Sequence, residues 1–219
     1  MTDQQPTKQR IHITFGKYGA LKYTSTLDIA KVWERVLRRA HLPILYTQGF
    51  NTRPRMQLAS ALPLGITSEC EIIDVYLREQ ITLDGLCEQI LAVAPDGLEI
   101  YDIKTVGVDS PTLQQMVTSA KYRIRFDDGV DIELLKERIN TLLANERIVQ
   151  VHIRKNRKHV MDLRPLIHAL YIDDDNNLIA DLSAGDRGNV RLEDIIAQLE
   201  LGDIHYSAHR FELTLEDYH

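Results

Sequence analysis

The sequence predicts an α+β protein made of two ferredoxin-like (βαββαβ) units in tandem, with antiparallel sheets and helices on one face. Two observations predict this class: residues 10–106 show strand and helix patterns in the order βαββαβ, and residues 122–213 begin that order again. Such a unit folds into a four-stranded antiparallel sheet with both helices on one side. We therefore expect a first unit at residues 1–109, a linker at 110–118 and a second unit at 119–219.

The first half has clear strand and helix patterns. Apolar and polar residues alternate over residues 10–15, which predicts a half-buried strand. Ser25 or Thr26 can cap the helix that follows. Its apolar residues recur at helical spacing from Ile29 to Ala40, and "HLP" ends it because proline cannot continue the helix. Further strands are expected at residues 56–61, 70–77 and 98–106, with a helix at residues 82–93.

The second half begins the same order and adds an insertion. The stretch "GVDSPTLQQMVTSA" before it predicts a linker with a short helix. Strands are expected at residues 122–126 and 148–154 around a helix at 131–144, followed by the basic segment "RKNRKHVMDLRPLI", a hairpin of "ALYID" and "LIADL", a helix at 191–199 and a strand near 204–213. We interpret this half as a second ferredoxin-like unit with a hairpin insertion.

The composition is that of a soluble globular protein. Of the 219 residues, 44% are hydrophobic and 26% are charged. No apolar run approaches the roughly 18–20 residues that a membrane-spanning helix needs, and "MTDQQPTKQR" at the start does not resemble a signal peptide. We therefore expect a cytoplasmic protein without a membrane partner.

The charges are distributed unevenly along the chain. Residues 1–65 contain 10 Lys and Arg against 3 Asp and Glu, whereas residues 66–219 contain 16 against 29. A basic first part can offer a positive surface to an anion while the acidic remainder discourages indiscriminate binding. The alternative is that these charges only solvate the surface.

The sequence lacks the motifs of most enzyme classes. It has no iron–sulfur C-x-x-x-C-x-x-C loop, no phosphate loop, no G-x-G-x-x-G, no G-x-S-x-G and no H-E-x-x-H. Cys70 and Cys87 form no C-x-x-C pair, so neither a disulfide nor a thiolate metal site is indicated. We expect no cofactor and no catalytic residue, with Asp28 and Tyr23 as the candidate proton-transfer groups if the protein is an enzyme after all.

Arginine, lysine and tyrosine side chains form the candidate nucleic-acid-binding set. Arginine forks bind phosphate oxygens and tyrosine rings stack on bases, so this mixture suits RNA. In the first half the candidates are Lys17, Lys22, Tyr23, Arg35, Arg38, Arg39, Gln48, Asn51, Arg53 and Arg55. In the second half they are Arg154, Lys155, Arg157, Lys158 and Arg164. Asp162 is expected to form an ion pair with Arg164, although a simple turn of exposed cations is the ordinary alternative for this segment.

Several long motifs resemble one bacterial family. They are "ITFGKYGALKYTSTLD", "WERVLRRAHLPILYTQGFNTRPR", "ALPLGITSECE", "RKHVMDLRPLI" and "GNVRLEDIIAQL". Over nearly its whole length the chain resembles the bacterial radical-SAM-linked proteins, a domain of unknown function that occurs alone or joined to a radical S-adenosylmethionine protein. The resemblance implies such an enzyme as partner. Relatives often have Ser-His-Leu-Asp and Asn-Pro-His-Pro where this chain has Ser25–Asp28 and Asn51–Pro54 without either histidine, which argues against catalysis here.

Together these observations predict a non-catalytic RNA-binding accessory protein that works with a radical S-adenosylmethionine enzyme. The element order is also similar to that of RNA endonucleases of bacterial defence, which is a likeness of fold alone. A metal-independent enzyme that processes or modifies RNA, and a protein–protein adaptor that does not bind RNA, remain the alternatives.

Overall fold

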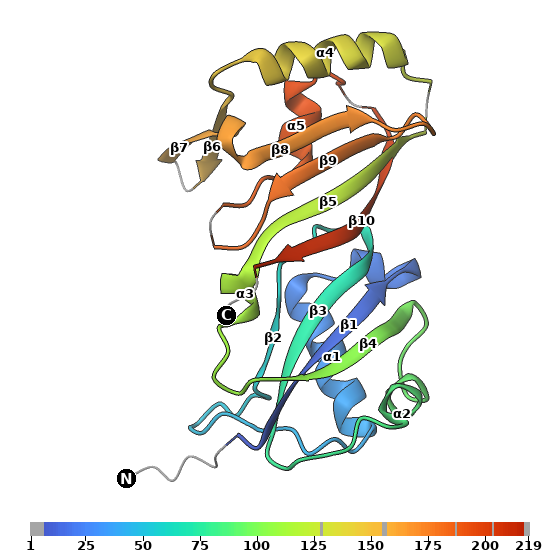
Figure 1. Cartoon of the computed structure of the whole chain (residues 1–219), viewed down its shortest axis with the longest axis vertical. Helices are drawn as coiled ribbons and strands as arrows, with labels where there is room; N and C mark the ends of the chain where they lie inside the picture. Colours follow the sequence, from blue (N-terminus) through green and yellow to red (C-terminus); the bar gives the residue numbers. More distant parts are fainter. Residues whose placement is uncertain (1–6, 128, 155–156, 187, 203, 217–219) are drawn as a thin grey trace. The chain divides into compact units, whose positions relative to one another are not determined.

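The computed structural model describes residues 7–127, 129–154, 157–186, 188–202 and 204–216. The chain divides into two compact units (Figure 1). Unit 1 comprises the described residues up to Val117 together with Leu215 and Glu216, and unit 2 comprises those from Thr118 to Thr214. Within the described residues, no helix is long and apolar enough to cross a membrane.

Unit 1 contains the βαββαβ order that the sequence predicts. Its elements are β1 (Gln9–Lys17), the 3-10 helix η1 (Gly19–Tyr23), α1 (Thr26–Arg39), β2 (Met56–Leu58), β3 (Thr67–Leu77), α2 (Leu86–Leu91), β4 (Leu98–Val106) and α3 (Leu113–Met116). The strands lie in the order β4-β1-β3-β2, and all three pairings are antiparallel. Helices α1 and α2 pack against one face of this sheet.

Helix α1 follows the predicted apolar stripe. The Ser25 hydroxyl caps its first turn by accepting a hydrogen bond from the Asp28 backbone N–H at 3.2 Å. Trp33 is fully buried, and its ring lies 4.9 Å from that of Phe15 in an edge-to-face contact. The stripe therefore joins α1 to the central strand of the sheet, as predicted.

Strand β1 is buried on both faces, so the prediction of a half-buried strand is wrong. Arg10 and His12, expected on the solvent side, are 0% and 5% exposed. The Arg10 guanidinium donates to both Asp74 carboxylate oxygens, at 3.0 and 2.6 Å, and to the backbone carbonyls of Ser110 and Pro111, at 2.6 and 2.8 Å. The segment after β4 thus covers the second face of β1, and alternation alone cannot show this because the cover comes from about 100 residues away.

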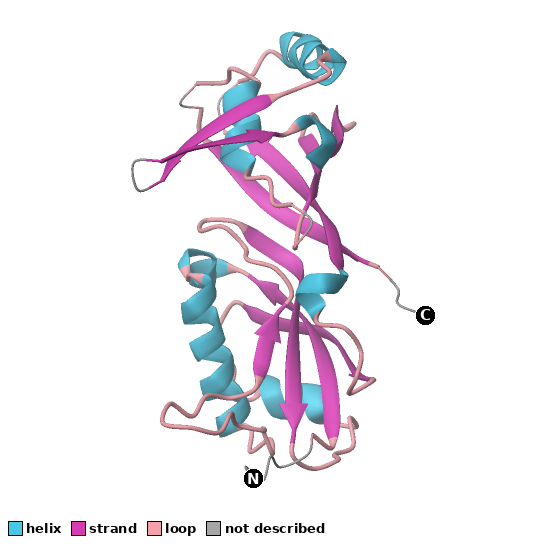
Figure 2. Cartoon of the chain, turned by 90° about the vertical axis from the view of Figure 1, so that its left-hand side faces the viewer, coloured by secondary structure: helices cyan, strands magenta, loops and turns pink. Residues whose placement is uncertain are grey.

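Unit 2 combines a sheet with two helices and a separate hairpin. Its elements are β5 (Val117–Phe126), α4 (Ile132–Ala144), β6 (Val149–Arg154), β7 (Arg157–Asp162), the 3-10 helix η2 (Arg164–Leu166), β8 (Ile167–Ile172), β9 (Leu178–Ser183), α5 (Leu192–Gln198) and β10 (Tyr206–Leu215). The sheet order is β10-β5-β9-β8, and β6 and β7 form a separate two-stranded sheet (Figure 2). The basic segment expected to be a turn therefore includes a strand, while the fold as a whole is mixed α+β with mostly antiparallel strands, as predicted.

Two elements of unit 1 are shorter than predicted. Helix α2 was expected from residue 82, but Gly85 precedes its first residue with a φ of 72°, which a right-handed helix cannot include. Strand β2 ends at Leu58 instead of residue 61. In both places apolar residues continue past the end of the element, so the apolar pattern overestimates its length.

A glycine substitution tests the packing at the end of β1. Gly97 has a φ of 85°, its carbonyl accepts from the Tyr18 N–H at 2.8 Å, and an added Cβ would lie 2.5 Å from the Tyr18 carbonyl oxygen. We expect Gly97→Ala to lower the free energy of unfolding by more than the ~1–2 kcal/mol that the left-handed conformation alone costs an alanine. Gly85→Ala is the matched control, because Gly85 also has a positive φ but an added Cβ there meets nothing within 4 Å. Equal losses in urea unfolding of the two variants would contradict the predicted clash.

Candidate nucleic-acid interface

The segment from Leu42 to Arg55 is held by a triangle of backbone hydrogen bonds. Leu45 donates to the Tyr76 carbonyl at 2.8 Å, Tyr76 donates to the Arg55 carbonyl at 3.1 Å, and Arg55 donates to the Leu45 carbonyl at 2.7 Å. Thr47 donates to the Arg53 carbonyl at 2.8 Å and so closes the base of the loop between them. Residues 48–52 consequently project from a fixed base beside β3.

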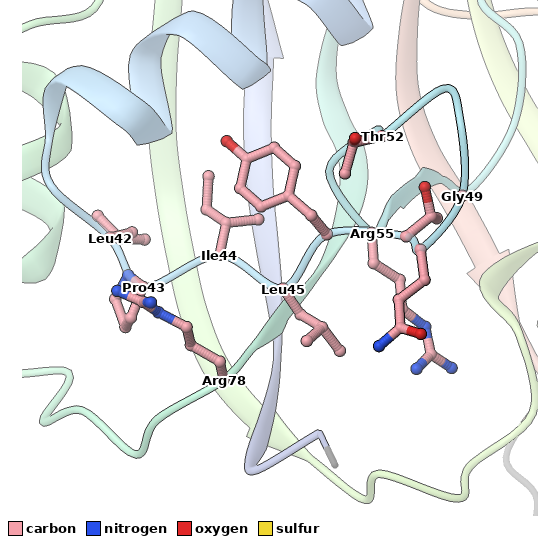
Figure 3. Close-up of a pocket in the computed structure, with 11 residues that line it drawn as sticks. Leu42, Pro43, Ile44, Leu45, Gly49, Thr52, Arg55 and Arg78 are labelled. Carbon is pink, nitrogen blue, oxygen red and sulfur yellow. The ribbon is translucent and has the colours of Figure 1, made fainter. Parts of the chain in front are cut away.

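This segment lines a hollow of about 1040 Å³ (Figure 3). The lining residues are Leu42, Pro43, Ile44, Leu45, Tyr46, Thr47, Gln48, Gly49, Thr52, Arg55 and Arg78. The side chains of Leu42, Ile44 and Leu45 are buried, whereas the Tyr46 side chain is 38% exposed. The hollow therefore combines backbone groups, an aromatic ring and two arginines.

The Arg55 guanidinium is held over an aromatic ring. Its central carbon lies 4.3 Å from the ring centre of Tyr76, and one of its nitrogens donates to the Thr7 hydroxyl at 3.1 Å. Tyr76 is only 8% exposed and also lies 5.3 Å from the buried Arg10 guanidinium. A buried ring thus fixes the plane of an exposed arginine, and such a cation–π contact lowers the entropy that a ligand must remove.

Five exposed arginines gather at the end of unit 1 where β1 begins. We call this set the arginine end: Arg38, Arg39, Arg53, Arg55 and Arg78. Arg38 and Arg39 occupy the last turn of α1, a few residues before Leu42, and the Arg78 N–H donates to the Pro43 carbonyl at 2.9 Å. One acidic side chain lies among them, because Glu79 contacts Arg78 at 3.5 Å in an exposed ion pair. Four of the ten lysines and arginines of residues 1–65 therefore lie at this end, together with Arg78.

Lys17 does not belong to an exposed surface, contrary to the prediction that it contacts RNA. Its side chain is 2% exposed, and its ammonium donates to the Thr24 carbonyl at 2.8 Å. The predicted strand ended at residue 15 and left Lys17 outside it, but β1 extends to include Lys17. A buried lysine with a carbonyl partner stabilises the turn and is not available to a phosphate.

Lys22 and Tyr23 lie at the opposite end of β1 from the arginine end. The Lys22 ammonium lies 5.0 Å from the Tyr23 ring centre, and the Lys22 carbonyl accepts from the Gly65 N–H at 2.8 Å. Strand β1 pairs Arg10 with Tyr76 at one end and Lys17 with Ser68 at the other, a separation on the order of 20 Å for an extended strand. The predicted single basic face of the first half is therefore two separate clusters.

The other predicted residues of unit 1 are all exposed. Gln48, Asn51 and Arg53 lie in the projecting loop, and Arg35 lies on the outer face of α1. Gln48 also lines the hollow. Gln48 and Arg55 therefore lie at the same hollow, whereas Arg53 lies at the base of the loop and is not one of the lining residues.

The predicted cations of unit 2 separate in their roles. Lys158 is exposed on β7, but Arg164 is half-buried and donates to the Leu143 carbonyl at 3.1 Å. Arg154 and Arg157 are paired in the β6–β7 register, and Lys155 lies outside the described residues. Arg164 therefore holds the fold of unit 2 and is not a surface contact.

Asp162 does not pair with the Arg164 guanidinium as predicted. Its carboxylate accepts from the backbone N–H groups of Ile148 and Arg164, at 2.9 and 3.1 Å, and contacts the Arg147 side chain at 3.3 Å. The hydrogen bond from Ile148 is the main reason why the pKa of this carboxyl lies below its ordinary value. Asp162, the last residue of β7, therefore connects the β6–β7 hairpin to Arg147 and Ile148, which follow α4.

The sequence matches the family described as uncharacterized protein conserved in bacteria (DUF2344) over residues 10–192. The chain belongs to this family. No curated protein matches it. Similar solved structures include a chain of a Cbf5-Nop10-Gar1 complex, with a TM-score of 0.45 and 9% identity over 94% of this chain and 50% of that one. Another is a putative glycine cleavage system transcriptional repressor, with a TM-score of 0.23 and 13% identity over 92% and 96%. This chain spans half the length of the first of these structures.

The sequence did not identify Arg78 and Tyr76 as candidate site residues. Both follow the strand pattern of residues 70–77, where Tyr76 looks like an ordinary core residue and Arg78 like an exposed strand end. The position of Arg78 in the lining of the hollow depends on a hydrogen bond to Pro43, and that of Tyr76 beside the Arg55 guanidinium on a hydrogen bond to Arg55, both to residues more than 20 positions earlier in the chain. The only local signal was that Arg78 directly follows the predicted strand, two residues after Tyr76.

Asp28, the candidate acid of the alternative enzyme reading, is an exposed helix-capping residue. It accepts a hydrogen bond from the Ser25 hydroxyl at 2.7 Å and lies 3.6 Å from the Lys31 ammonium. The Ser25 hydrogen bond is the main reason why the pKa of Asp28 lies below its ordinary value. A carboxyl with a lowered pKa is ionised at neutral pH and is a poor general acid. Asp28 is therefore a residue of the first turn of α1 and a poor candidate for a general acid.

Proposed function

We propose that this protein is a cytoplasmic, non-catalytic RNA-binding accessory protein and that the arginine end makes its main contact with RNA. The observation that carries the proposal is that Arg55 and Arg78 line one hollow, with Arg55 already stacked on Tyr76 and Arg53 at the base of the same loop. Guanidinium groups bind phosphate in two-pronged geometry and stack on bases, so their combination with a hollow suits a flexible nucleic-acid strand.

The acidic remainder of the chain supports a restricted mode of contact. The whole protein carries a formal net charge of −6, so a polyanion is repelled from most of the surface. Binding then depends on the local charge of the arginine end, and its affinity should depend steeply on salt.

The fold and the partner form the second part of the proposal. The strand orders β4-β1-β3-β2 and β10-β5-β9-β8 support two tandem ferredoxin-like units, the second with β6 and β7 inserted. The partner is a radical S-adenosylmethionine enzyme acting on the bound RNA or on an RNA-containing assembly. This partner rests on the motif resemblance described above.

Titration of single-stranded RNA at several salt concentrations tests the RNA-binding function. We expect measurable binding to the intact protein, with log K falling linearly as log salt rises. In the Arg53→Ala/Arg55→Ala variant the slope should become smaller by about 2, because each arginine contributes roughly one released counterion.

The matched control removes two positive charges from unit 2. Arg125→Ala/Lys136→Ala changes the net charge equally at exposed positions outside the arginine end, and it should leave the slope unchanged. Absence of RNA binding by the folded intact protein would overturn the proposal. Stable co-purification of a radical enzyme in that case would favour the protein–protein adaptor instead.

A further inference from the structure

We infer that the hollow beside β3 holds one unstacked base of single-stranded RNA, laid flat on the Arg55 guanidinium, with Arg78 on a neighbouring phosphate. This inference rests on the proposed RNA-binding function and names the form of RNA that the site recognises. It also assigns Tyr46 and Arg78, which the sequence alone did not single out, to the same contact.

The Arg55 guanidinium stacks on Tyr76 and its side chain also lines the hollow. The Tyr76 ring centre lies 4.3 Å from the guanidinium carbon. The Arg55 side chain is further held by the hydrogen bond to Thr7 at 3.1 Å. A planar cation that is already oriented in this way is a stacking platform for a nucleobase.

The lining of the hollow fits a nucleotide. Its volume of about 1040 Å³ is close to the upper end of pockets that take small ligands, about 300–1,000 Å³. The Tyr46 side chain, which is 38% exposed, also lines the hollow and supplies a second flat surface. Thr52 adds a hydroxyl (Figure 3). Aromatic and guanidinium planes together are the usual surfaces on which splayed RNA bases stack.

Both arginines line the same hollow and are anchored to one short segment of its wall. The Arg78 backbone N–H donates to the Pro43 carbonyl and the Arg55 backbone N–H donates to the Leu45 carbonyl. These two anchor residues are two positions apart, about 7 Å between Cα atoms in an extended segment. We therefore assign one guanidinium to a base and the other to a phosphate of the same strand.

Double-stranded RNA does not fit this contact. The bases of an A-form duplex are stacked inside it, and its deep, narrow major groove keeps side chains from reaching them. In a duplex, only the phosphates are accessible to the arginine side chains of the arginine end. The site should therefore prefer unpaired RNA to a duplex of the same length and sequence.

The test uses the full chain and a short single-stranded RNA that carries the fluorescent base 2-aminopurine, alone or annealed to its complement. We compare Arg55→Lys with the matched control Arg53→Lys, since both keep the charge and lose the planar group. Arg55→Lys should weaken binding of the single strand about tenfold, the effect of losing one stacked base, and should remove the change in 2-aminopurine fluorescence that binding causes. Arg53→Lys should preserve this fluorescence change, and the duplex should bind both variants alike.

Several outcomes separate this inference from the function on which it rests. In the first set of outcomes, RNA binding depends on salt, but the two lysine variants show the same affinity and fluorescence, or single strand and duplex bind equally well. Either result contradicts the stacked base but agrees with the proposed RNA-binding function. Absence of binding by either RNA overturns both. If Arg55→Lys unfolds the protein in a thermal scan, the Tyr46→Ala variant tests the stacked base instead. This substitution removes the second flat surface and should also reduce the fluorescence change.

Discussion

Replacing Asp74 with asparagine is expected to lower the free energy of unfolding by about 3–5 kcal/mol. Asp74 and Arg10 are both fully buried, and the Arg10 guanidinium donates to both oxygens of this carboxylate. Asparagine leaves the arginine charged and buried without a compensating anion, and removing one partner of a buried pair carries that full penalty. Urea unfolding followed by the fluorescence of Trp33, the only tryptophan and a core residue of unit 1, measures the loss.

Lys31→Gln is the control for the effect of removing an ion pair in the same unit. It breaks the contact between Lys31 and Asp28, whose side chains are 66% and 57% exposed. Exposed pairs contribute about 0–1 kcal/mol, so the control should unfold almost as the intact protein does. A loss below about 1 kcal/mol for Asp74→Asn would show that the buried pair contributes no more than a surface pair.

Acid should weaken unit 1 through the same carboxylate. Burial raises the pKa of Asp74, but the hydrogen bonds and charges of His12 and Arg10 outweigh it, and the net pKa lies below the ordinary value. A group with a depressed pKa in the folded state stabilises the protein above its unfolded pKa of about 3.9, and that stability is lost as pH falls through the folded value. Stability should therefore decline below about pH 4, and Asp74→Asn should reduce the decline.

Reversing the charge of both arginines that line the hollow is expected to abolish most RNA binding. In Arg55→Glu/Arg78→Glu, two carboxylates replace the guanidinium groups that we assign to a base and a phosphate. Affinity at low salt should fall about 100-fold or more, since each lost arginine contact costs about 1–3 kcal/mol and the new charges repel phosphate. Fluorescence anisotropy with labelled single-stranded RNA measures the change.

The control for this reversal carries the same change in net charge at exposed positions of unit 2. Arg125→Glu/Lys136→Glu should change the affinity only slightly, because both side chains lie outside the arginine end. If the two reversals weaken binding to the same extent, net charge alone governs the affinity and the hollow has no special role. Thermal unfolding of each variant checks that the fold is intact.

Local patterns predicted the elements that depend on neighbouring residues. The α1 stripe, the Ser25 cap and the bounds of β4 agree with the structure because helical and strand periodicity act within a few positions. The same reasoning failed for Arg10 and His12 on β1, and for Lys17 at its end, because alternation describes one strand and does not show what covers its second face.

The sequence by itself determined the order of the elements, the apolar faces of the helices and the concentration of positive charge in residues 1–65. Tertiary structure decided which of these charges meet. Arg55 is placed on Tyr76, Arg78 beside Pro43, and Arg10 between Asp74 and the segment after β4 by hydrogen bonds between residues 21 to 101 positions apart. These contacts depend on the register of β3 against β1, against β2 and against Ile44, a property of strand pairing that no local pattern contains.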